Sequence, residues 1–419
     1  MLPRPARDRY ANMNSRPLPP ETDSARGWVV VAGTFVFLVL GFGAAYSFTA
    51  FFPSLEAEFQ ASREEISLMF GISGFLYFCW GAVSGGIADK FGTRFVVLLG
   101  TVLLGVGLIA GSLAATLTQA YLAFGLGIGI GIGFAYVPSV GAVQRWFLAK
   151  RGMAGGFAVA GIGVGTLIGP PIAAELIEYG GWRFAYLVLG FTVLTIGLAA
   201  ATRIDDPPSH KLGRAAGGAG LQGMELGKAL RSRAFLLFWL SSFLLSLGLF
   251  VPFVHLVPYA IDRGFGADAG VLLLSLIGVG STLGRFVLAG FADKMGRRNA
   301  LVLMYAGVGL MDLLWLWGGP LESLYVFAVI YGLCYGGFVG TAPAVSADYF
   351  GMKRLSSVIG WLYTSVAFGT LVGPPLAGRA FDLYQSYDLP ILVGAVSGLA
   401  GAVIVLLIGN PRADFSVAD

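Results

Sequence analysis

Three ionisable side chains lie well inside long apolar stretches of this sequence: His255, Arg285 and Asp312. Burying a charge away from water costs free energy, so such groups are candidates for binding a ligand or a partner. The Arg285 guanidinium can hold a carboxylate through two parallel hydrogen bonds. An imidazole exchanges protons near neutral pH. These residues therefore predict the binding of a small organic anion at Arg285, assisted by His255.

Each residue also has a purely structural explanation. Arg285 could form a fixed ion pair or extend toward lipid headgroups, His255 could be a packed and satisfied histidine, and Asp312 could make a polar contact to a neighbouring helix. Asp262, two turns after His255, and Asp312 are further candidates for carrying a proton. Because the helices around 255 and 285 are consecutive in the chain, His255 is a candidate for the same cavity as Arg285.

The segments that must position these residues are long and apolar. Hydrophobic residues make up 56% of the 419 and charged residues 12%, about half of what a water-soluble domain carries. Runs of roughly 20 apolar residues span a bilayer as helices, which satisfy their own backbone polar groups. We expect an all-α membrane protein with twelve transmembrane helices, at 28–52, 66–87, 95–116, 119–143, 152–176, 183–202, 235–261, 269–292, 299–318, 321–347, 355–379 and 388–409.

The basic residues are unevenly divided between the connections that join these runs. Of the 27 Lys and Arg, only Arg63, Arg183, Arg263 and Arg379 lie in the connections opposite the termini. Cytoplasmic loops carry the excess of basic residues, so both termini are expected in the cytoplasm. We expect a disordered cytoplasmic tail (1–25), an N-terminal six-helix half (26–202), a cytoplasmic linker loop (203–234), a C-terminal six-helix half (235–409) and a second tail (410–419).

The two halves repeat one another at an offset of 204 residues. Asp89-Lys90 falls on Asp293-Lys294, and the tripeptide at 169–171 (Gly-Pro-Pro) falls on the one at 373–375. Two six-helix halves in parallel pseudo-repeat are the architecture of the major facilitator superfamily, in which the substrate binds between the halves.

The loops that contain these Asp-Lys pairs resemble the signature loop of that superfamily. The first reads Gly-x-x-x-Asp-Lys-x-Gly-x-Arg over 85–94, and the second repeats it over 289–298 with Ala in the first position. A single copy could be an ordinary basic loop with a turn glycine. Two copies predict a conformational latch that breaks and re-forms as the halves move, made by Asp89, Lys90, Arg94, Asp293, Lys294 and Arg298.

Two further segments resemble the monocarboxylate transporter family, in a bacterial-type form. The segment WFLAKRGMAGGFAVAG (146–161) matches the aromatic, Lys-Arg and small-residue pattern of that family. Asp23, Gly27 and Trp28 match the first family signature, although Arg26 replaces its aromatic residue. The resemblance implies alternating-access transport of a short monocarboxylate such as lactate or pyruvate, with proton symport. It also implies an integral protein of the plasma membrane, which in bacteria is the inner membrane.

The resemblance assigns roles to particular residues. Arg285 matches the helix 8 arginine that binds the substrate carboxylate. Tyr46 replaces a lysine, and Ser281 an acidic residue, of the usual proton pathway in several animal members. Proton coupling is then left to His255, Asp262, Asp312 or the substrate carboxylate itself. Hydroxyl groups on cavity-lining helices could orient the substrate, with packing as the alternative role; these are Tyr46, Tyr136, Tyr335 and Tyr363.

Two other functions remain open. An oxalate–formate type antiporter would place a lysine in helix 11, but 356–378 contains no Lys or Arg. One buried cation suits one carboxylate, because a second would remain unpaired at a large desolvation cost. A sensor that binds solute without moving it is the other alternative.

No cofactor, metal or nucleic-acid partner is expected. Cys79 and Cys334 lie inside apolar runs and form no metal-ligand cluster, and the alternating glycines at 125–133 indicate close helix packing and not a nucleotide loop. The absence of a nucleophile–base set argues against an enzyme. The expected partners are a small monocarboxylate anion, a proton and the lipid bilayer, for a protein that acts as a monomer.

Overall fold

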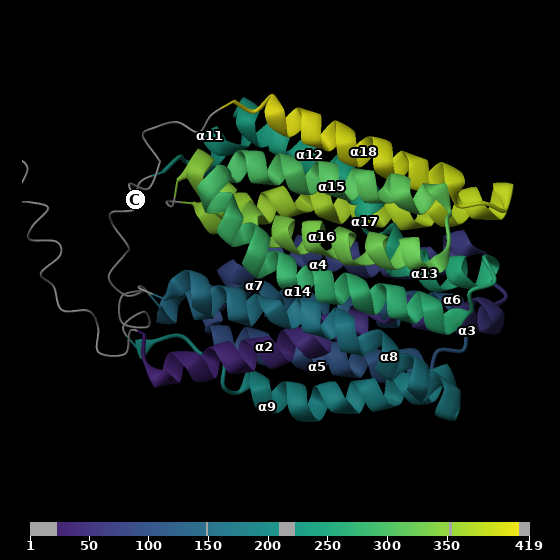
Figure 1. Cartoon of the computed structure of the whole chain (residues 1–419). Helices are drawn as coiled ribbons and strands as arrows, with labels where there is room; N and C mark the ends of the chain where they lie inside the picture. Colours follow the sequence, from purple (N-terminus) through teal and green to yellow (C-terminus); the bar gives the residue numbers. More distant parts are fainter. Residues whose placement is uncertain (1–22, 148–149, 209–222, 352–353, 410–419) are drawn as a thin grey trace, which may run out of the picture.

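The structure, a computed structural model, describes residues 23–147, 150–208, 223–351 and 354–409. Most of the two expected tails and the centre of the expected linker lie outside these residues. The described chain is helical almost throughout, with one isolated β-bridge between Gly223 and Gly351. Figure 1 shows long helices running side by side in a bundle.

The N-terminal half contains ten assigned helical segments, some of which continue one another. They are α2 (Ala25–Tyr46), α3 (Phe48–Phe59), α4 (Arg63–Phe91), α5 (Thr93–Ser112), α6 (Leu117–Leu122), η1 (Ala123–Ile130), α7 (Gly131–Trp146), α8 (Arg151–Thr192), η2 (Val193–Gly197) and α9 (Leu198–Ala201).

One short helix, α11, lies within the expected linker, and the helices of the C-terminal half follow it. The segments are α11 (Leu226–Leu230), α12 (Arg233–Leu249), α13 (Val251–Asp262), α14 (Ala267–Met295), α15 (Arg297–Trp317), α16 (Leu321–Phe350), α17 (Leu355–Tyr384) and α18 (Asp388–Leu406). The linker is thus not entirely loop: α11 packs on α17, and the Met224 amide donates to the Phe350 carbonyl.

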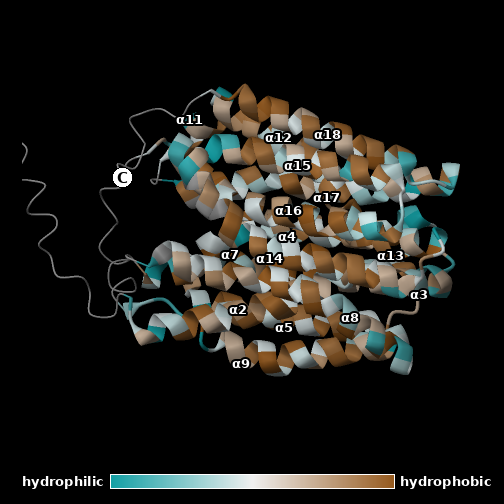
Figure 2. Cartoon of the chain, viewed as in Figure 1, coloured by the Kyte–Doolittle hydropathy of each residue, from teal (hydrophilic) through white to brown (hydrophobic). Residues whose placement is uncertain are grey.

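Ten helices among the described residues are long and apolar enough to cross a membrane. One of them, 152–201, bends at Gly181, which has a non-helical φ of 80°. Dividing it there, and adding the 30-residue α17, assigns a long helix to each of the twelve expected runs. Apolar residues cover the middle of the bundle and hydrophilic residues gather at its two ends (Figure 2). The protein is an integral membrane protein.

The helix boundaries repeat the offset found in the sequence. α4 spans 63–91 and α14 spans 267–295, while α8 begins at 151 and α17 at 355. Both α4 and α14 end at a glycine with positive φ, Gly92 (93°) and Gly296 (89°), a conformation that favours glycine. The parallel repeat of two halves is therefore confirmed.

Two equivalent helix pairs hold the halves together. α4 packs on α17, and α8 packs on α14. Small residues let these backbones approach closely: a β-carbon at Gly74 would lie 2.3 Å from Thr370 Cγ2, and one at Gly278 would lie 2.4 Å from the Leu167 amide nitrogen. Because each pair contains one helix from each half, motion between the halves must occur along these contacts.

The bundle has two distinct ends. The start of α2 and the last described residues after α18 lie at the same end in Figure 1, which we call the terminal end. α6, the C-terminal part of α3 and the C-terminal part of α13 lie at the opposite end, the distal end.

Candidate functional site

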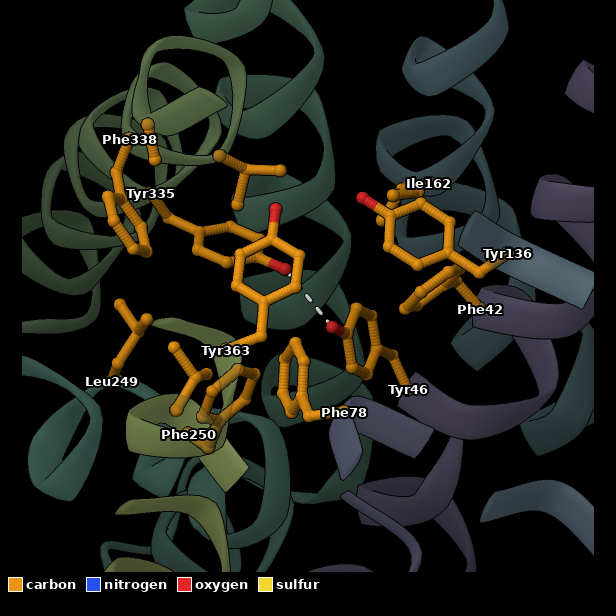
Figure 3. Close-up of a pocket in the computed structure, with 13 residues that line it drawn as sticks. Phe42, Tyr46, Phe78, Tyr136, Ile162, Leu249, Phe250, Tyr335, Phe338 and Tyr363 are labelled. Atoms are coloured by element: carbon orange, nitrogen blue, oxygen red, sulfur yellow. Dashed lines mark hydrogen bonds between the residues drawn. The ribbon is translucent and has the colours of Figure 1, made fainter. Parts of the chain in front are cut away.

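A small cavity lies between the two halves and is walled mainly by aromatic side chains (Figure 3). Five of its lining residues come from the N-terminal half and eight from the C-terminal half, and none of them is charged. The lining residues are Phe42, Tyr46, Phe78, Tyr136, Ile162, Leu249, Phe250, Tyr335, Phe338, Val339, Ala342, Tyr363 and Val366.

All four tyrosines singled out in the sequence line this cavity. Tyr46 comes from α2, Tyr136 from α7, Tyr335 from α16 and Tyr363 from α17. The hydroxyl groups of Tyr46 and Tyr335 are 3.0 Å apart and form a hydrogen bond between the halves, drawn as a dashed line in Figure 3. The cavity thus offers hydroxyl groups in an otherwise apolar wall.

Arg285 is buried beside this cavity, with 4% of its surface exposed. Its Cζ lies 5.9 Å from the centre of the Tyr335 ring. Nη1 donates to the Ser281 carbonyl (3.1 Å) and the Ser281 hydroxyl (2.7 Å). Nε and Nη2 are buried and have no hydrogen-bond partner among the described residues. These two nitrogens share one edge of the guanidinium, the edge that can present parallel N–H groups to a carboxylate.

Arg285 also lies directly at the contact between the halves. A β-carbon at Gly163 of α8 would lie 3.0 Å from Arg285 Nη1 and 2.2 Å from Thr282 Oγ1. Because residue 163 is a glycine, the Arg285 guanidinium and the Thr282 hydroxyl have room beside α8. A group bound at Arg285 would sense the relative position of α8 and α14.

His255 does not line the cavity, contrary to what its neighbouring position in the sequence suggested. The seventh expected run (235–261) is interrupted at Phe250, between α12 and α13, and His255 lies beyond this break. Its ring is buried and packs 5.5 Å from Phe52. Nε2 lies 3.0 Å from the Pro374 carbonyl and Nδ1 lies 3.1 Å from the Tyr387 hydroxyl. Its polar contacts thus belong to the distal end of the bundle.

The distal end carries an ionic cluster that the sequence did not predict. Arg63, at the start of α4, binds both carboxylate oxygens of Asp262 at the end of α13 (2.5 and 3.0 Å). The carboxylate of Asp382 in α17 accepts from the backbone amides of Arg63 (3.1 Å) and Glu64 (3.0 Å). We call Arg63, Asp262, Asp382 and Tyr387 the distal gate, because these contacts join the two halves at this end.

Tyr387 links the distal gate to His255. Arg63 Nη1 donates a hydrogen bond to the Tyr387 hydroxyl (2.7 Å). That hydroxyl can therefore donate its own hydrogen bond to His255 Nδ1. Burial raises the pKa of Tyr387 above its ordinary value, despite the opposing influence of Arg63. The Tyr387 hydroxyl therefore remains a donor at physiological pH, and both ring nitrogens of His255 have a hydrogen-bond partner.

The two other proton-carrying candidates lie apart from the cavity. Asp262 is the counter-ion of Arg63 in the distal gate. Asp312 lies in α15 with 2% of its surface exposed, and its Oδ2 has no hydrogen-bond partner among the described residues.

This chain resembles known proteins over most of its length. The family model of the Major Facilitator Superfamily matches residues 33–327 and 272–416. The chain is 30% identical to human "Monocarboxylate transporter 11" over 413 residues, which cover 93% of this chain and 84% of that protein. It is 27% identical to human "Monocarboxylate transporter 2" (94% and 87% covered) and 28% identical to the "MFS-type transporter opdF" of Penicillium oxalicum (90% and 89%). The chain belongs to the monocarboxylate transporter family.

A solved structure shows the same fold. The crystal structure of a bacterial homologue of the human lysosomal transporter Spinster, in an inward-facing and unoccupied conformation, matches with a TM-score of 0.64 at 15% identity. The match covers 92% of this chain and 96% of that one. The solved structure therefore shares the fold of this chain, and the matching family model makes the chain a member of the Major Facilitator Superfamily.

The residues expected to form a latch lie at the terminal end of the transporter. Arg94 forms an ion pair with Asp205 (3.1 Å), and Arg298 Nη2 donates to the Leu406 carbonyl (2.6 Å). Lys90 and Lys294 are exposed. The side chains of Asp89 and Asp293 lie outside the described part of the structure.

A second acidic residue after α9 completes this terminal cluster. Arg145 Nη2 lies 2.7 Å from Asp206 Oδ1, and the Thr93 amide donates to Asp206 at 3.4 Å. Burial by itself raises the pKa of Asp206, but the Arg145 charge and the hydrogen bonds from Thr93 and Arg145 outweigh it and hold the pKa below its usual value. Asp205 and Asp206 were not among the residues predicted from the sequence, although an acidic pair directly after a long apolar run could have indicated such a cluster.

Proposed function

We propose that this protein moves a short monocarboxylate, such as lactate or pyruvate, across the plasma membrane together with a proton. Its relatives are named monocarboxylate transporters, which supports the substrate class. The observation that carries the proposal is the free edge of Arg285, where Nε and Nη2 are buried without a partner among the described residues. A buried cation of this kind favours an anionic ligand over an empty site.

The substrate would lie between Arg285 and the aromatic cavity. Its carboxylate would accept from Nε and Nη2, while its short carbon chain would contact the apolar cavity wall. A hydroxy or keto oxygen could then bond to the hydroxyls of Tyr335 or Tyr46. The cavity combines an apolar wall with a few hydroxyl groups, as small-molecule sites do, which suits an acid of a few carbons.

The charge of the site favours a single carboxylate. The cavity lining contains no charged side chain, so Arg285 is the one cation that the described site provides. A dicarboxylate would carry a second negative charge into an apolar wall, at a cost of several kcal/mol. We therefore propose a monoanion as cargo, in preference to the oxalate–formate type of exchange.

Alternating access would involve the distal gate and the terminal end in turn. In this structure the distal gate joins the two halves. Opening to the distal side would require the Arg63–Asp262 pair to separate, while the proposed latch of Asp89, Lys90, Arg94, Asp293, Lys294 and Arg298 would close the terminal side. In this proposal the terminal end, with both termini, faces the cytoplasm, and the excess of basic residues at that end supports this orientation.

Purified protein in liposomes tests this proposal. Labelled pyruvate or lactate should accumulate inside when the outer solution is made more acidic, and unlabelled monocarboxylates should compete while oxalate and malonate should not. Uptake that requires an anion on the opposite side and ignores the pH difference would instead indicate an exchanger. Absence of uptake for every short monocarboxylate would overturn the proposal, and saturable binding without uptake would indicate a sensor.

A further inference from the structure

Asp312 lies next to the break between α12 and α13, on the side of the C-terminal half formed by α12, α15 and α18. A β-carbon at Gly394 of α18 would lie 3.1 Å from Asp312 Oδ2, and one at Gly248 of α12 would lie 2.5 Å from Gly394 Cα. Gly248 is the penultimate residue of α12, which ends where the helix is interrupted. The Asp312 carboxyl group is thus packed next to the crossing of α18 with the end of α12.

The surroundings of Asp312 suit a neutral carboxyl group. The Tyr331 hydroxyl on α16, which interacts electrostatically with Asp312, donates to the Leu249 carbonyl (3.0 Å) at the helix break. α12 and α18 carry charged residues only at their first positions, Arg233 and Asp388. No described Lys, Arg or His pairs directly with Asp312, so its ionised form has no neighbouring counter-ion inside the membrane and is costly.

We infer that Asp312 is the proton-carrying group of the transport cycle, loaded and released as the break between α12 and α13 changes shape. This inference rests on the proposed symport of a monocarboxylate. It gives the protein a proton site that replaces the acid missing at Ser281, and it places that site outside the substrate cavity. Asp262 is then a member of the distal gate, paired with Arg63, and His255 is bonded to Tyr387 of that gate, so both already have partners.

Charge balance explains why proton and anion would move together. With neither ligand bound, Arg285 is positive and Asp312 negative, so the two buried groups sum to zero. With both bound, the substrate carboxylate neutralises Arg285 and the proton neutralises Asp312, and the sum is again zero. Binding only one ligand leaves one unit of charge in a region of low dielectric constant, which is costly. The proton leaves Asp312 as the anion leaves Arg285, so one of each crosses per cycle.

The substitution Asp312→Asn separates the proton step from the substrate step, because an amide resembles the neutral acid in size. In liposomes, exchange of labelled for unlabelled pyruvate at equal pH needs no net proton movement, and D312N should retain it within about two-fold. Accumulation driven by a pH difference, and the proton entry reported by an internal dye, should fall at least ten-fold. Asp268→Asn, at an exposed position at the start of α14, is the matched control and should behave as the wild type in every assay.

A second measurement uses the wild-type protein and needs no transport. A carbodiimide that reacts with protonated carboxyl groups in apolar surroundings should label Asp312 at pH 6 and label it less at pH 8.5, as mapped by mass spectrometry. Full proton-driven accumulation by D312N would overturn the inference, and so would equal or absent labelling at both pH values. Absence of any pyruvate exchange by the wild type would instead overturn the proposed function, while pH-dependent labelling would still support the proton site.

Discussion

The hydroxyl groups of Tyr46 in α2 and Tyr335 in α16 form a hydrogen bond of 3.0 Å across the cavity. One residue belongs to each half, so this bond spans the surface along which the halves must separate. The Tyr335 ring also lies beside Arg285. The pair is therefore placed to detect a substrate held by Arg285, and to exchange its mutual hydrogen bond for bonds to that substrate.

Removing one hydroxyl should weaken the handling of substrates that carry a hydroxy or keto group. We expect Tyr335→Phe to raise the KM for lactate by roughly 3- to 10-fold, the loss of a single hydrogen bond of about 0.5–1.5 kcal/mol. Acetate, which lacks the second oxygen, should be affected less. Tyr384→Phe, at an exposed position, is the control. Equal effects of Tyr335→Phe on lactate and acetate would contradict a role in recognising the second oxygen.

The distal gate should govern access from the distal side. Arg63→Ala leaves Asp262 and the Tyr387 hydroxyl without their donor, and breaking a partly buried ion pair can cost a few kcal/mol. Thr49 is buried next to α13, where it accepts a hydrogen bond from the Val257 amide. A cysteine in place of Thr49 should then react about ten-fold faster with a water-soluble thiol reagent. The parent protein for this measurement would carry Cys79→Ser and Cys334→Ser, so that the introduced cysteine is the one that reacts.

The control for the distal gate is Arg379→Ala, because Arg379 pairs with Glu64 at 3.6 Å but is largely exposed. Exposed pairs contribute little, on the order of 0–1 kcal/mol. The Thr49→Cys labelling rate should stay near that of the parent. If Arg63→Ala and Arg379→Ala gave the same rate, the gate would not depend on the Arg63–Asp262 pair.

His255 should affect the rate of the cycle more than the affinity for substrate. Its ring bonds to the Pro374 carbonyl and the Tyr387 hydroxyl, away from the cavity lining. We expect His255→Gln to lower the maximal uptake rate several-fold while changing the KM for pyruvate less than about two-fold. Concentration series in liposomes measure both quantities. A large increase in KM at unchanged maximal rate would show instead that His255 contacts the substrate.

The Asp206 site should make stability depend on pH. A carboxyl group whose folded-state pKa is depressed stabilises the protein above its unfolded-state pKa, and this stabilisation is lost as the pH falls through the folded-state value. Asp206→Asn should therefore lower the melting temperature by a few degrees at pH 7. The difference from the wild type should shrink below the ordinary aspartate value of 3.8. A difference that is independent of pH would contradict the ionic role.

Several features of the site could be predicted from the sequence because they depend on local pattern. The 204-residue offset predicted equivalent helices, and the structure gives α4 and α14 matching bounds. Tyr46, Tyr136, Tyr335 and Tyr363 lie at positions on four helices that the resemblance placed around one cavity, and they line it. The apolar runs and the order of the helices, together with the resemblance, were therefore sufficient to predict these features.

Other features depend on which side of a helix faces which neighbour, and this was not predictable. His255 and Arg285 lie on consecutive helices, but the interruption at Phe250 places His255 on α13, where it faces the Tyr387 hydroxyl. Arg63 and Asp262 are 199 residues apart in the chain, so no local pattern indicates that they pair. Each contact forms only when the two halves pack together.

The most direct test of the proposed carboxylate site is the binding of pyruvate to purified protein carrying Arg285→Lys, compared with the wild type, by calorimetry. Lysine keeps the charge but lacks the two-nitrogen edge formed by Nε and Nη2. Loss of this paired contact, roughly 3 kcal/mol, predicts about 100-fold weaker binding, while Arg379→Lys should bind as the wild type does. Unchanged affinity for pyruvate in Arg285→Lys and in Arg285→Ala would contradict the assignment of Arg285 as the anchor of the substrate.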